Sequence, residues 1–519
     1  MQNTVGPRPV CLLIRYAETV SSQPSGPIVR ISPAELHIND PDYYDSLYNR
    51  EGKWEKNPFY VNSFGNTVSG FATVDHDLHR MRRAAINPFF SKQKVMQLQP
   101  VIQRLADKLC AKFEKCRGTD EVIPFECAFD AFTMDVITEY SLDTSFGYLD
   151  HPGWSSDFRE LERAFGEMGY MQKMFPPLIS IMQSLPDRLV IWMDPKSKLL
   201  LDFFRNCYAI AEKMVGETDG TKYEEKEHPT IFYEIIHSDL PPAEKTPKRL
   251  EGEAAAVLGA GAVTTAWTLT VAMYHLTVNP EKLARLRAEL GEVMPDPHQP
   301  AKLQQLERLP YLTSVIMESL RLSNGVSTRL ARIAPDRSIY FRDLEIPKGT
   351  PVSMTSTLIH QNPDIFPQPL EFLPERWLDS NEKQQLEKYL VPFSRGSRQC
   401  AGIKSVRPVS PELDASYSLA GHLLLRSLML ILLKSCLGRI IHHDRCDVYE
   451  VRSGSVRNHE GRCGHLQRYA DCRAKEICEW CQISDQLIPP YQINTKRNEA
   501  RMPGERMKQT LREYRKLLG

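Results

Sequence analysis

The stretch Phe393–Gly402, with the sequence FSRGSRQCAG, contains the residues that most clearly could do chemistry. A metal-bound cysteine must be a thiolate, and nearby positive charge and hydrogen-bond donors hold the pKa of a thiol down. Cys400 follows two arginines, of which Arg398 could pair with a carboxylate carried by a cofactor. Gly396 can adopt backbone geometry closed to other residues, and Gly402 lets the backbone approach a flat group closely. The stretch therefore predicts a thiolate presented to a metal in a flat cofactor.

The same stretch resembles the haem-binding signature of the cytochrome P450 family, F-x-x-G-x-R-x-C-x-G. Its fixed positions match at Phe393, Gly396, Arg398, Cys400 and Gly402. The resemblance implies that Cys400 is the axial ligand of the iron in haem b, where a thiolate pushes electron density toward O–O cleavage. A free cysteine in a surface loop is the alternative for this stretch taken alone.

Residues 247–276 form the longest predicted helix, and residues 259–265 at its centre read GAGAVTT. Two interior glycines cost roughly 1 kcal/mol each relative to alanine, so packing alone gives no obvious reason for them. A helix that lets dioxygen and a porphyrin lie against its backbone would give one. A plain threonine- and alanine-rich core helix is the alternative.

This centre resembles the oxygen-binding A-G-x-(D/E)-T-(T/S) motif of the P450 family. The motif falls on Ala260, Gly261, Thr264 and Thr265. The resemblance implies that Thr264 and Thr265 are catalytic residues, with Thr264 hydrogen-bonding the bound dioxygen and relaying protons. The acidic position of the motif is Val263 here, which leaves water and Thr264 to carry the protons.

A dense group of basic residues lies in the segment 75–91, DHDLHRMRRAAINPFFS. His79 and Arg83 are four residues apart and share one face of the predicted helix. Basic side chains this close repel one another unless an anion lies among them. The P450 resemblance supplies that anion, the haem propionates, and implies that Arg332 contacts a propionate as well. A solvated basic helix is the alternative.

A second charge pattern is predicted to be structural. Glu318 and Arg321 are three residues apart in the apolar helical stretch 309–322, so they share a buried face. A buried charge pair needs a further partner, and Arg376 in the sequence FLPERW is the natural one. These residues match the E-x-x-R helix and PERW loop of the P450 family. The match implies that the three residues fix the loop that presents Cys400.

The composition excludes some functions and leaves others open. The 519 residues include 65 basic and 65 acidic side chains, so charge gives no case for nucleic acid as a partner. The cysteines before residue 404 show no paired spacing and predict reduced thiols. No stretch approaches the ~18–20 apolar residues of a spanning helix, and the chain start predicts no signal peptide.

The first 25 residues are predicted to be irregular, residues 26–31 a strand, and residues 32–35 and 40–42 two helix starts. Fungal P450s carry a similar GPIVRISP stretch, normally after a membrane anchor that this chain lacks. The family therefore implies the cytosolic face of the endoplasmic reticulum membrane, and the missing anchor implies a soluble, cytoplasmic chain instead.

The apolar stretch 175–193 is broken by prolines and cannot be one straight helix. The resemblance implies that residues 174–193 roof the substrate pocket and touch a membrane peripherally. A connection that covers a satellite core is an equally good reading. Short strands and a turn are predicted between residues 327 and 352. The resemblance places Val326 and Ser327 at the substrate pocket, and His360 is predicted to be structural.

The tail, residues 404–519, does not continue the pattern. The helix expected under the haem is absent, and a frame or splice error is the favoured explanation. Codons exist for residues 455–465 that give LYETTRDDVDI one nucleotide later, a string similar to the C-terminal strand region of fungal P450s. The alternative is a zinc module. Its ligands would be Cys463, His465, Cys472, Cys478 and Cys481.

These observations predict a mainly α fold with a small β region, a P450 fold incomplete at both ends, with its catalytic domain at residues 26–403. The resemblance implies a monooxygenase that oxidises an apolar small molecule with O2, in fungal secondary metabolism, with haem b and electrons from NADPH through cytochrome P450 reductase. Two alternatives remain open: an inactive haem-binding product without the C-terminal helix and strands, and a zinc-dependent interaction protein acting through the tail.

Overall fold

The computed structural model of this chain describes residues 26–402 with short gaps. The gaps are residues 62–67, 92–93, 95–96, 117, 120–122, 155–156, 176–180, 183, 196, 217–229 and 296–302. All described residues belong to one compact unit, Gly6–Val451. The predicted irregular start, the tail 404–519 and the zinc ligands proposed for it lie outside the described residues.

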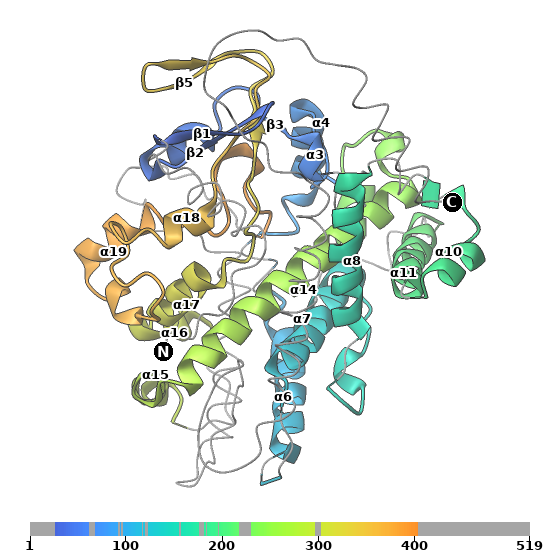
Figure 1. Cartoon of the computed structure of the whole chain (residues 1–519). Coiled ribbons are helices and arrows are strands. Elements are labelled where there is room, and N and C mark those ends of the chain that lie inside the picture. Colours follow the sequence, from blue (N-terminus) through green and yellow to red (C-terminus); the bar gives the residue numbers. More distant parts are fainter. Residues whose placement is uncertain are drawn as a thin grey trace, which may run out of the picture. The chain divides into compact units, whose positions relative to one another are not determined.

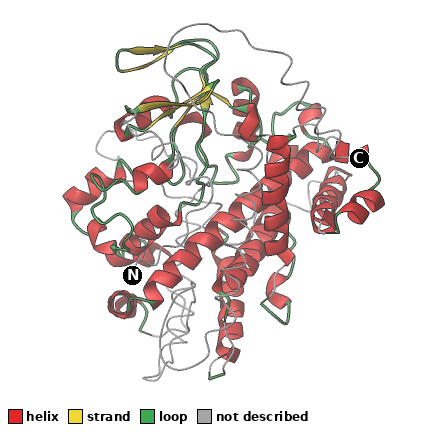
Figure 2. Cartoon of the chain, viewed as in Figure 1, coloured by secondary structure: helices red, strands yellow, loops and turns green. Residues whose placement is uncertain are grey.

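Helices dominate the described residues, and the prediction of a mainly α fold with a small β region is confirmed (Figure 1, Figure 2). The α-helices are α2 (Tyr44–Leu47), α3 (Pro58–Val61), α4 (His76–Ile86), α6 (Gln99–Cys116), α7 (Phe125–Leu142), α8 (Asp157–Met174), α10 (Asp187–Met193), α11 (Ser197–Gly216), α13 (Ile231–Ile236), α14 (Pro247–Thr277), α15 (Pro280–Val293), α16 (Leu303–Leu306), α17 (Pro310–Ser323), α18 (Ser356–His360) and α19 (Ser380–Glu387). Short 3-10 helices are η1 (Pro41–Tyr43), η3 (Tyr148–Asp150), η4 (Pro242–Glu244), η5 (Pro374–Trp377) and η6 (Gly396–Arg398).

The long helix α14 runs through the middle of the helical layer (Figure 1). It starts where Pro247 occupies the first turn and the Thr246 side chain accepts a hydrogen bond from the Arg249 amide. Its apolar side chains pack against α7, α11 and α17. By length and composition alone α14 could cross a membrane, but a buried core helix passes the same test.

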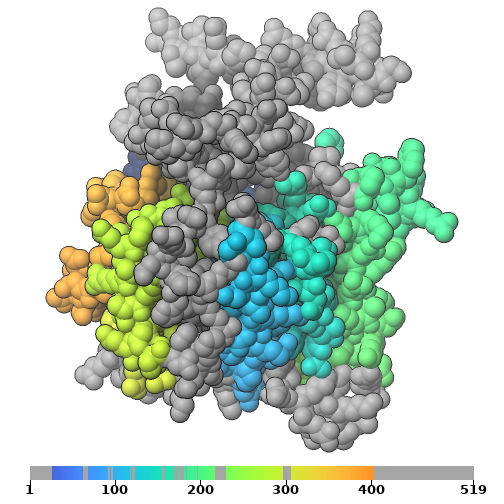
Figure 3. Space-filling model, turned by 90° about the horizontal axis from the view of Figure 1, so that it is seen from below, coloured from blue at the N-terminus to red at the C-terminus, as the bar shows by residue number. Residues whose placement is uncertain are grey.

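The helices beside α14 extend this core. Apolar residues of α6 and α7 belong to the same buried cluster as those of α14. In the space-filling view, the blue surface of α6 lies next to the teal segment that follows α7 (Figure 3). Lys112 of α6 donates there to the carbonyls of His151 and Gly153, at 2.6 and 2.8 Å.

The β region is small and brings distant parts of the chain together. Its five-stranded sheet has the order β1 (Ile28–Ser32), β2 (Glu35–Ile38), β7 (Val352–Ser353), β4 (Arg332–Ile333) and β3 (Glu55–Lys56). A separate hairpin pairs β5 (Ile339–Phe341) with β6 (Leu344–Ile346). The strand expected from residue 26 is β1, and the helix start at residues 40–42 is η1.

The other expected helix start, residues 32–35, is wrong. This segment is the tight turn that joins β1 to the antiparallel strand β2. Pro33 and the following residues satisfy a β-turn as well as a helix start, and the pairing of β1 with β2 decides between them. The stretch 175–193 is broken as predicted, with α8 ending at Met174 and α10 starting at Asp187.

Candidate active site

The loop that carries Cys400 is held by its own backbone and by the N-terminal segment. Gly396 has φ +78°, and a Cβ there would lie 2.3 Å from the Asn49 carbonyl oxygen. Any other residue would therefore force the loop away from this segment. The Cys400 amide donates to the Phe393 carbonyl at 2.9 Å and closes the loop. Cys400 is an exposed residue, and a Cβ at Gly402 would lie 3.8 Å from its sulfur.

Arg398 lies buried beneath this loop. Its guanidinium donates to backbone carbonyls of Trp54, Thr73, Val74 and Asp75 at 2.6 to 3.2 Å. Burial, reinforced by the charge of Arg332, lowers the pKa of Arg398 to about 9. Its protein contacts are backbone carbonyls that tie the loop to residues 73–75, and the pairing of Arg398 with a carboxylate of a cofactor stays a prediction.

Five basic side chains, one of them a histidine, gather next to the Cys400 loop, from segments far apart in the chain. They are Lys56, His79, Arg83, Arg332 and Arg398. Burial, together with the charges of Arg398, Lys56 and Arg83, lowers the pKa of His79 to about 2. Burial and the charges of Arg332, Arg398 and Arg83 hold the pKa of Lys56 well below its usual value. Such a cluster stabilises an anion placed among its members.

Arg332 and Arg83, like Arg398, donate to backbone carbonyls near the cluster. Arg332 is buried in β4 and donates to the carbonyls of Leu330 and Ala331 at 3.0 and 3.3 Å. Arg83 donates to the carbonyls of Gln399 and Cys400 at 3.1 and 3.2 Å. The sequence placed His79 and Arg83 on one helical face. It gave no signal that Arg83 reaches the backbone of the cysteine itself.

The centre of α14 leaves one stripe of small residues accessible. Ala260 is exposed and Thr264 half-buried, although Ala262, Thr265 and Ala266 around them are buried. The Thr264 hydroxyl donates to the Ala260 carbonyl one turn earlier, at 2.8 Å. Residues 260 and 264 lie on the same helical face. The stripe therefore offers a backbone and one hydroxyl to a flat group or a small molecule.

Gly261 has a different neighbour from the one expected. A Cβ at Gly261 would lie 3.0 Å from a side-chain carbon of Ile137 on α7. This glycine therefore allows α7 and α14 to pack closely, so packing does explain one of the two glycines. Among the described residues, no atom outside the helix's own backbone lies within 4 Å of a Cβ built at Gly259.

The loop after α17 approaches this stripe, which the sequence analysis missed. A Cβ at Gly325 would lie 3.9 Å from the Thr264 Cβ, its one neighbour within 4 Å. The Trp267 indole N–H, one turn beyond Thr264, donates to the Ser323 carbonyl at 2.6 Å. Asn324 ends α17 in the left-handed conformation, with φ +46°. The Asn-Gly pair after a helical pattern was the available signal for this helix end.

Glu318 and Arg321 form a fully buried pair, and Arg376 joins them. Arg321 donates to both Glu318 oxygens at 2.9 and 2.7 Å, and Arg376 donates at 3.2 Å. The Trp377 indole and the Leu373 amide also donate to Glu318, each at 2.9 Å. The structure thus brings together the three residues that the sequence grouped. Arg321 further donates to the carbonyls of His360, Pro369 and Glu371.

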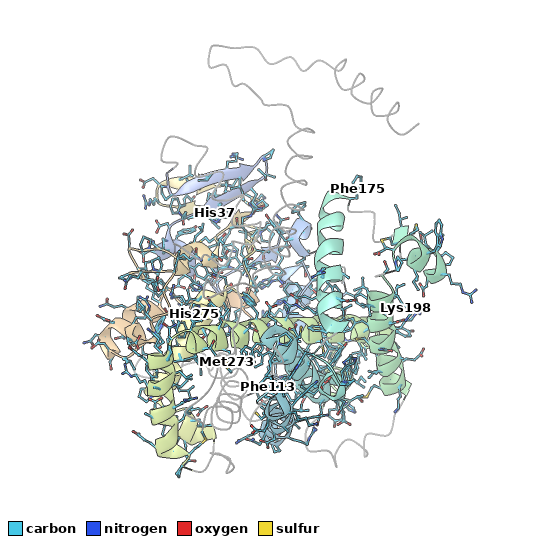
Figure 4. The ribbon with its side chains drawn as sticks, turned by 60° about the horizontal axis from the view of Figure 1, so that its bottom comes forward. His37, Phe113, Phe175, Lys198, Met273 and His275 are labelled. Atoms are coloured by element: carbon cyan, nitrogen blue, oxygen red, sulfur yellow. The ribbon has the colours of Figure 1, made fainter. Side chains whose placement is uncertain are left out.

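His360 links this network to the start of the cysteine loop. Its Nε2 accepts the Val391 amide at 3.0 Å, and burial lowers the pKa of His360 to about 3. A neutral, buried histidine whose Nε2 accepts from the backbone is consistent with the structural role predicted for it. A second histidine, His275 of α14, stacks on Phe372 with ring centroids 4.7 Å apart (Figure 4).

Comparison with known proteins decides the family. The family model of cytochrome P450 matches residues 22–404. The chain belongs to the cytochrome P450 family. Cytochrome P450 monooxygenase MO6277 of Ascocoryne sarcoides is 41% identical over 389 residues, which cover 73% of this chain and 76% of the relative. Tryptophan 6-hydroxylase fscE of Fusarium equiseti is 37% identical over 383 residues, covering 73% and 74%.

The fold comparison agrees with the family. A solved crystal structure of a cytochrome P450 superposes with a TM-score of 0.63 at 18% identity, and covers 83% of this chain and 89% of that one. The predicted P450 fold is therefore confirmed. The protein is a P450 monooxygenase, an oxidoreductase that incorporates oxygen from O2, and the family implies haem as its cofactor.

The described residues of this P450 fit haem on their own chemistry. Haem of the thiolate type needs a cysteine as its axial ligand and partners for two propionates. Cys400, an exposed cysteine, could be that ligand, and the basic cluster around Arg332 and Arg398 is suited to two carboxylates.

Proposed function

We propose that this P450 inserts one oxygen atom of O2 into a C–H bond, or epoxidises a double bond, of a small apolar molecule in fungal secondary metabolism. The observation that carries the proposal is the pairing of an exposed thiol with a buried cation cluster next to it. The relatives support the metabolic setting, because one is named a grayanic acid biosynthesis cluster P450 monooxygenase, of Cladonia grayi.

In this proposal the site residues divide into three tasks. Cys400 ligates the iron, and His79, Arg83, Arg332 and Arg398 hold the propionates. Phe393, Gly396 and Gly402 shape the loop, Ala260 lets a flat group lie near α14, and Gly261 lets α7 pack closely on that helix. Glu318, Arg321 and Arg376 hold the loop in place. Bound haem supplies oxygen activation and the oxidation of the C–H bond.

The protein's own part in proton delivery rests on Thr264. Its hydroxyl hydrogen-bonds to Ala260 and can turn toward the open stripe without breaking the helix. Val263 has no ionisable group, so this helix position supplies no acid, and Thr264 with water delivers the protons. Thr265 is buried beside it and supports the packing of the helix.

The decisive experiment tests whether an oxygen atom of O2 appears in the product. The purified chain, loaded with haem, is incubated with cytochrome P450 reductase, NADPH and a panel of apolar and indole compounds under heavy-oxygen-labelled O2. The panel includes tryptophan and N-acetyltryptophan, because two relatives are named as hydroxylases of these compounds. We expect a product that carries one labelled atom. A product without the label, or NADPH consumption that no compound in the panel stimulates, would contradict the proposal.

The space beside Thr264 gives a prediction that needs no known substrate. Gly325→Val should weaken binding of 4-phenylimidazole about tenfold, roughly 1.4 kcal/mol, and leave binding of imidazole nearly unchanged. The added side chain would occupy the space next to Thr264, into which we expect the phenyl ring of the larger ligand to extend. The measurement is the Soret shift on titration. Gly291→Val on α15, where a Cβ also has open space, is the control.

An exposed apolar surface supports the proposed membrane contact through residues 174–193. Phe175 lies at the end of α8 away from α14 (Figure 4). It is 65% exposed, and Trp192 on α10 is 79% exposed. Ile181, Leu189 and Met193 are exposed as well. Aromatic and aliphatic side chains at this exposure favour the interface of a bilayer. We propose that residues 174–193 contact the cytosolic face of the endoplasmic reticulum membrane.

Trp192→Glu should lower the fraction of protein that sediments with phosphatidylcholine vesicles several-fold, because it replaces an interfacial indole by a charge. Tyr340→Glu, on the separate β5–β6 hairpin and also exposed, is the matched control and should sediment like the unmodified protein. Equal loss in both variants would show that any added negative charge weakens the contact, and would contradict a specific role for residues 174–193.

A further inference from the structure

A buried network of four charged side chains has no role in the site described so far. We call Arg82, Glu244, Arg249 and Glu253 the brace. Arg82 of α4 donates to both oxygens of Glu244 in η4 at 2.7 and 2.8 Å. Arg249 of α14 donates to Glu244 at 3.0 Å and to Glu253 at 2.5 Å. The four side chains are 3 to 13% exposed, and their two positive and two negative charges balance.

The brace is hydrogen-bonded to the segment 69–75, which precedes α4 in the chain. The Gly70 amide donates to Glu253 at 2.8 Å, and Arg82 donates to the Thr73 hydroxyl oxygen at 2.8 Å. The same hydroxyl donates to the Ser69 carbonyl at 2.9 Å. A Cβ at Gly70 would lie 3.3 Å from Glu253, so the fit is close. Two side chains, one from α14 and one from α4, thus hold one short stretch of backbone.

The same segment is also hydrogen-bonded to Arg398. The carbonyls of Thr73 and Val74 accept from its guanidinium at 2.7 and 2.6 Å, and that of Asp75 at 3.0 Å. Thr73 therefore bonds to both groups: its hydroxyl oxygen accepts from Arg82 of the brace, and its carbonyl oxygen accepts from Arg398. Arg83, the residue after Arg82, reaches the Gln399 and Cys400 carbonyls. Neighbouring arginines of α4 thus connect to the brace and to the cysteine loop.

We propose that the brace is a positioning device for the thiolate loop, and that Thr73 is the residue through which it acts. The brace fixes segment 69–75 to α14, and this segment fixes Arg398 and with it the position of Cys400 relative to that helix. The inference rests on the proposed function, since it takes Cys400 as the haem ligand. Breaking the link at Thr73 would leave a folded protein whose cysteine ligation is easily lost.

The test compares two substitutions of the same kind. Thr73→Val removes the hydroxyl that meets the brace and keeps the carbonyl that meets Arg398. Thr270→Val, on α14, removes a similarly buried hydroxyl that bonds only within its own helix, to the Ala266 carbonyl at 2.9 Å. The full chain carries haem in each case. The readouts are the ratio of thiolate-type to neutral-ligand ferrous–CO absorbance during mild warming, and the iron midpoint potential.

We expect Thr73→Val to lose the thiolate-type band several-fold faster than the unmodified protein and to shift the midpoint potential, and Thr73→Ser to restore both. Thr270→Val should leave both unchanged. Glu253→Gln keeps an oxygen for the Gly70 amide but removes the charge that pairs with Arg249, and should behave like Thr73→Val. If Thr73→Val does not fold, Thr73→Ser and Glu253→Gln are compared instead. Thr73→Ser should then behave like the unmodified protein, and Glu253→Gln should lose the thiolate-type band faster.

The outcomes separate this inference from the proposed function. If the unmodified protein gives no thiolate-type band, the proposed role of Cys400 fails. The positioning role is overturned if the unmodified protein gives that band but Thr73→Val and Thr270→Val show the same rate of band loss and the same midpoint potential. The brace would then be only part of the packing. Equal acceleration in both valine variants, or a Thr73→Ser variant that does not recover, would overturn it as well.

Discussion

Cys400→Ser should remove the strongly red-shifted ferrous–CO band of the haem-loaded protein and reduce oxygenation to background. A serine hydroxyl is a poor donor to iron and is not ionised near neutral pH, whereas a thiolate supplies the electron density that produces both the colour and the chemistry. The substitution adds no bulk to an exposed residue, so the fold should persist. Difference spectra of the reduced protein with CO, with haem quantified separately, measure the effect.

Cys127→Ser is the matched control for this experiment. Cys127 lies on α7, half-buried, and burial raises the pKa of its thiol, which makes a thiolate there unfavourable. Its replacement should keep the band of the unmodified protein. Should Cys400→Ser retain the unmodified colour and CO response, another residue must ligate the iron. The assignment of the cysteine loop would then fail, even though the family membership of the chain would stand.

The sequence could predict contacts that depend on local spacing or on a rigid motif. Glu318 and Arg321 share a helical face because they are three residues apart, and the apolar residues around them signal burial. Gly396 could be predicted because its loop needs a positive φ, and the structure gives +78°. In both cases the identities and spacing of a few neighbouring residues are enough to predict the feature.

Contacts that depend on the path of the backbone could not be predicted in this way. Arg398 meets carbonyls of residues 54 and 73–75, more than three hundred positions away, and a carbonyl has no signature in the sequence. Gly261 faces Ile137 because α7 crosses α14 at this point, which no pattern within α14 encodes. The brace joins α4, η4 and α14, and its charged residues look like ordinary solvated side chains until the chain is folded.

Arg321→Met should be the most destabilising of these substitutions, by roughly 3–5 kcal/mol, because it leaves the Glu318 carboxylate buried with one cation fewer. Both side chains have 0% exposure in the structure. The loss should appear as a lower unfolding midpoint in urea and less soluble protein. Lys388→Met is the matched control. Its ion pair with Asp42 is equally short at 2.6 Å but half-exposed, and such pairs contribute at most about 1 kcal/mol.

The same network should give the protein an acid limit that Glu318→Gln alters. Burial alone would raise the pKa of Glu318, but the hydrogen bond and charge of Arg321, with Arg376 and the Leu373 amide, lower it below the usual 4.5. A lowered pKa in the folded state means stability that is present above the unfolded value and is lost as pH falls through the folded one. Urea midpoints of the unmodified protein should therefore fall with acidification below pH 4.5. Glu318→Gln should start lower and fall less steeply, because its amide has no proton to gain. Parallel curves for the two proteins would mean that other carboxylates set the acid limit and that the pair contributes no pH-dependent stability.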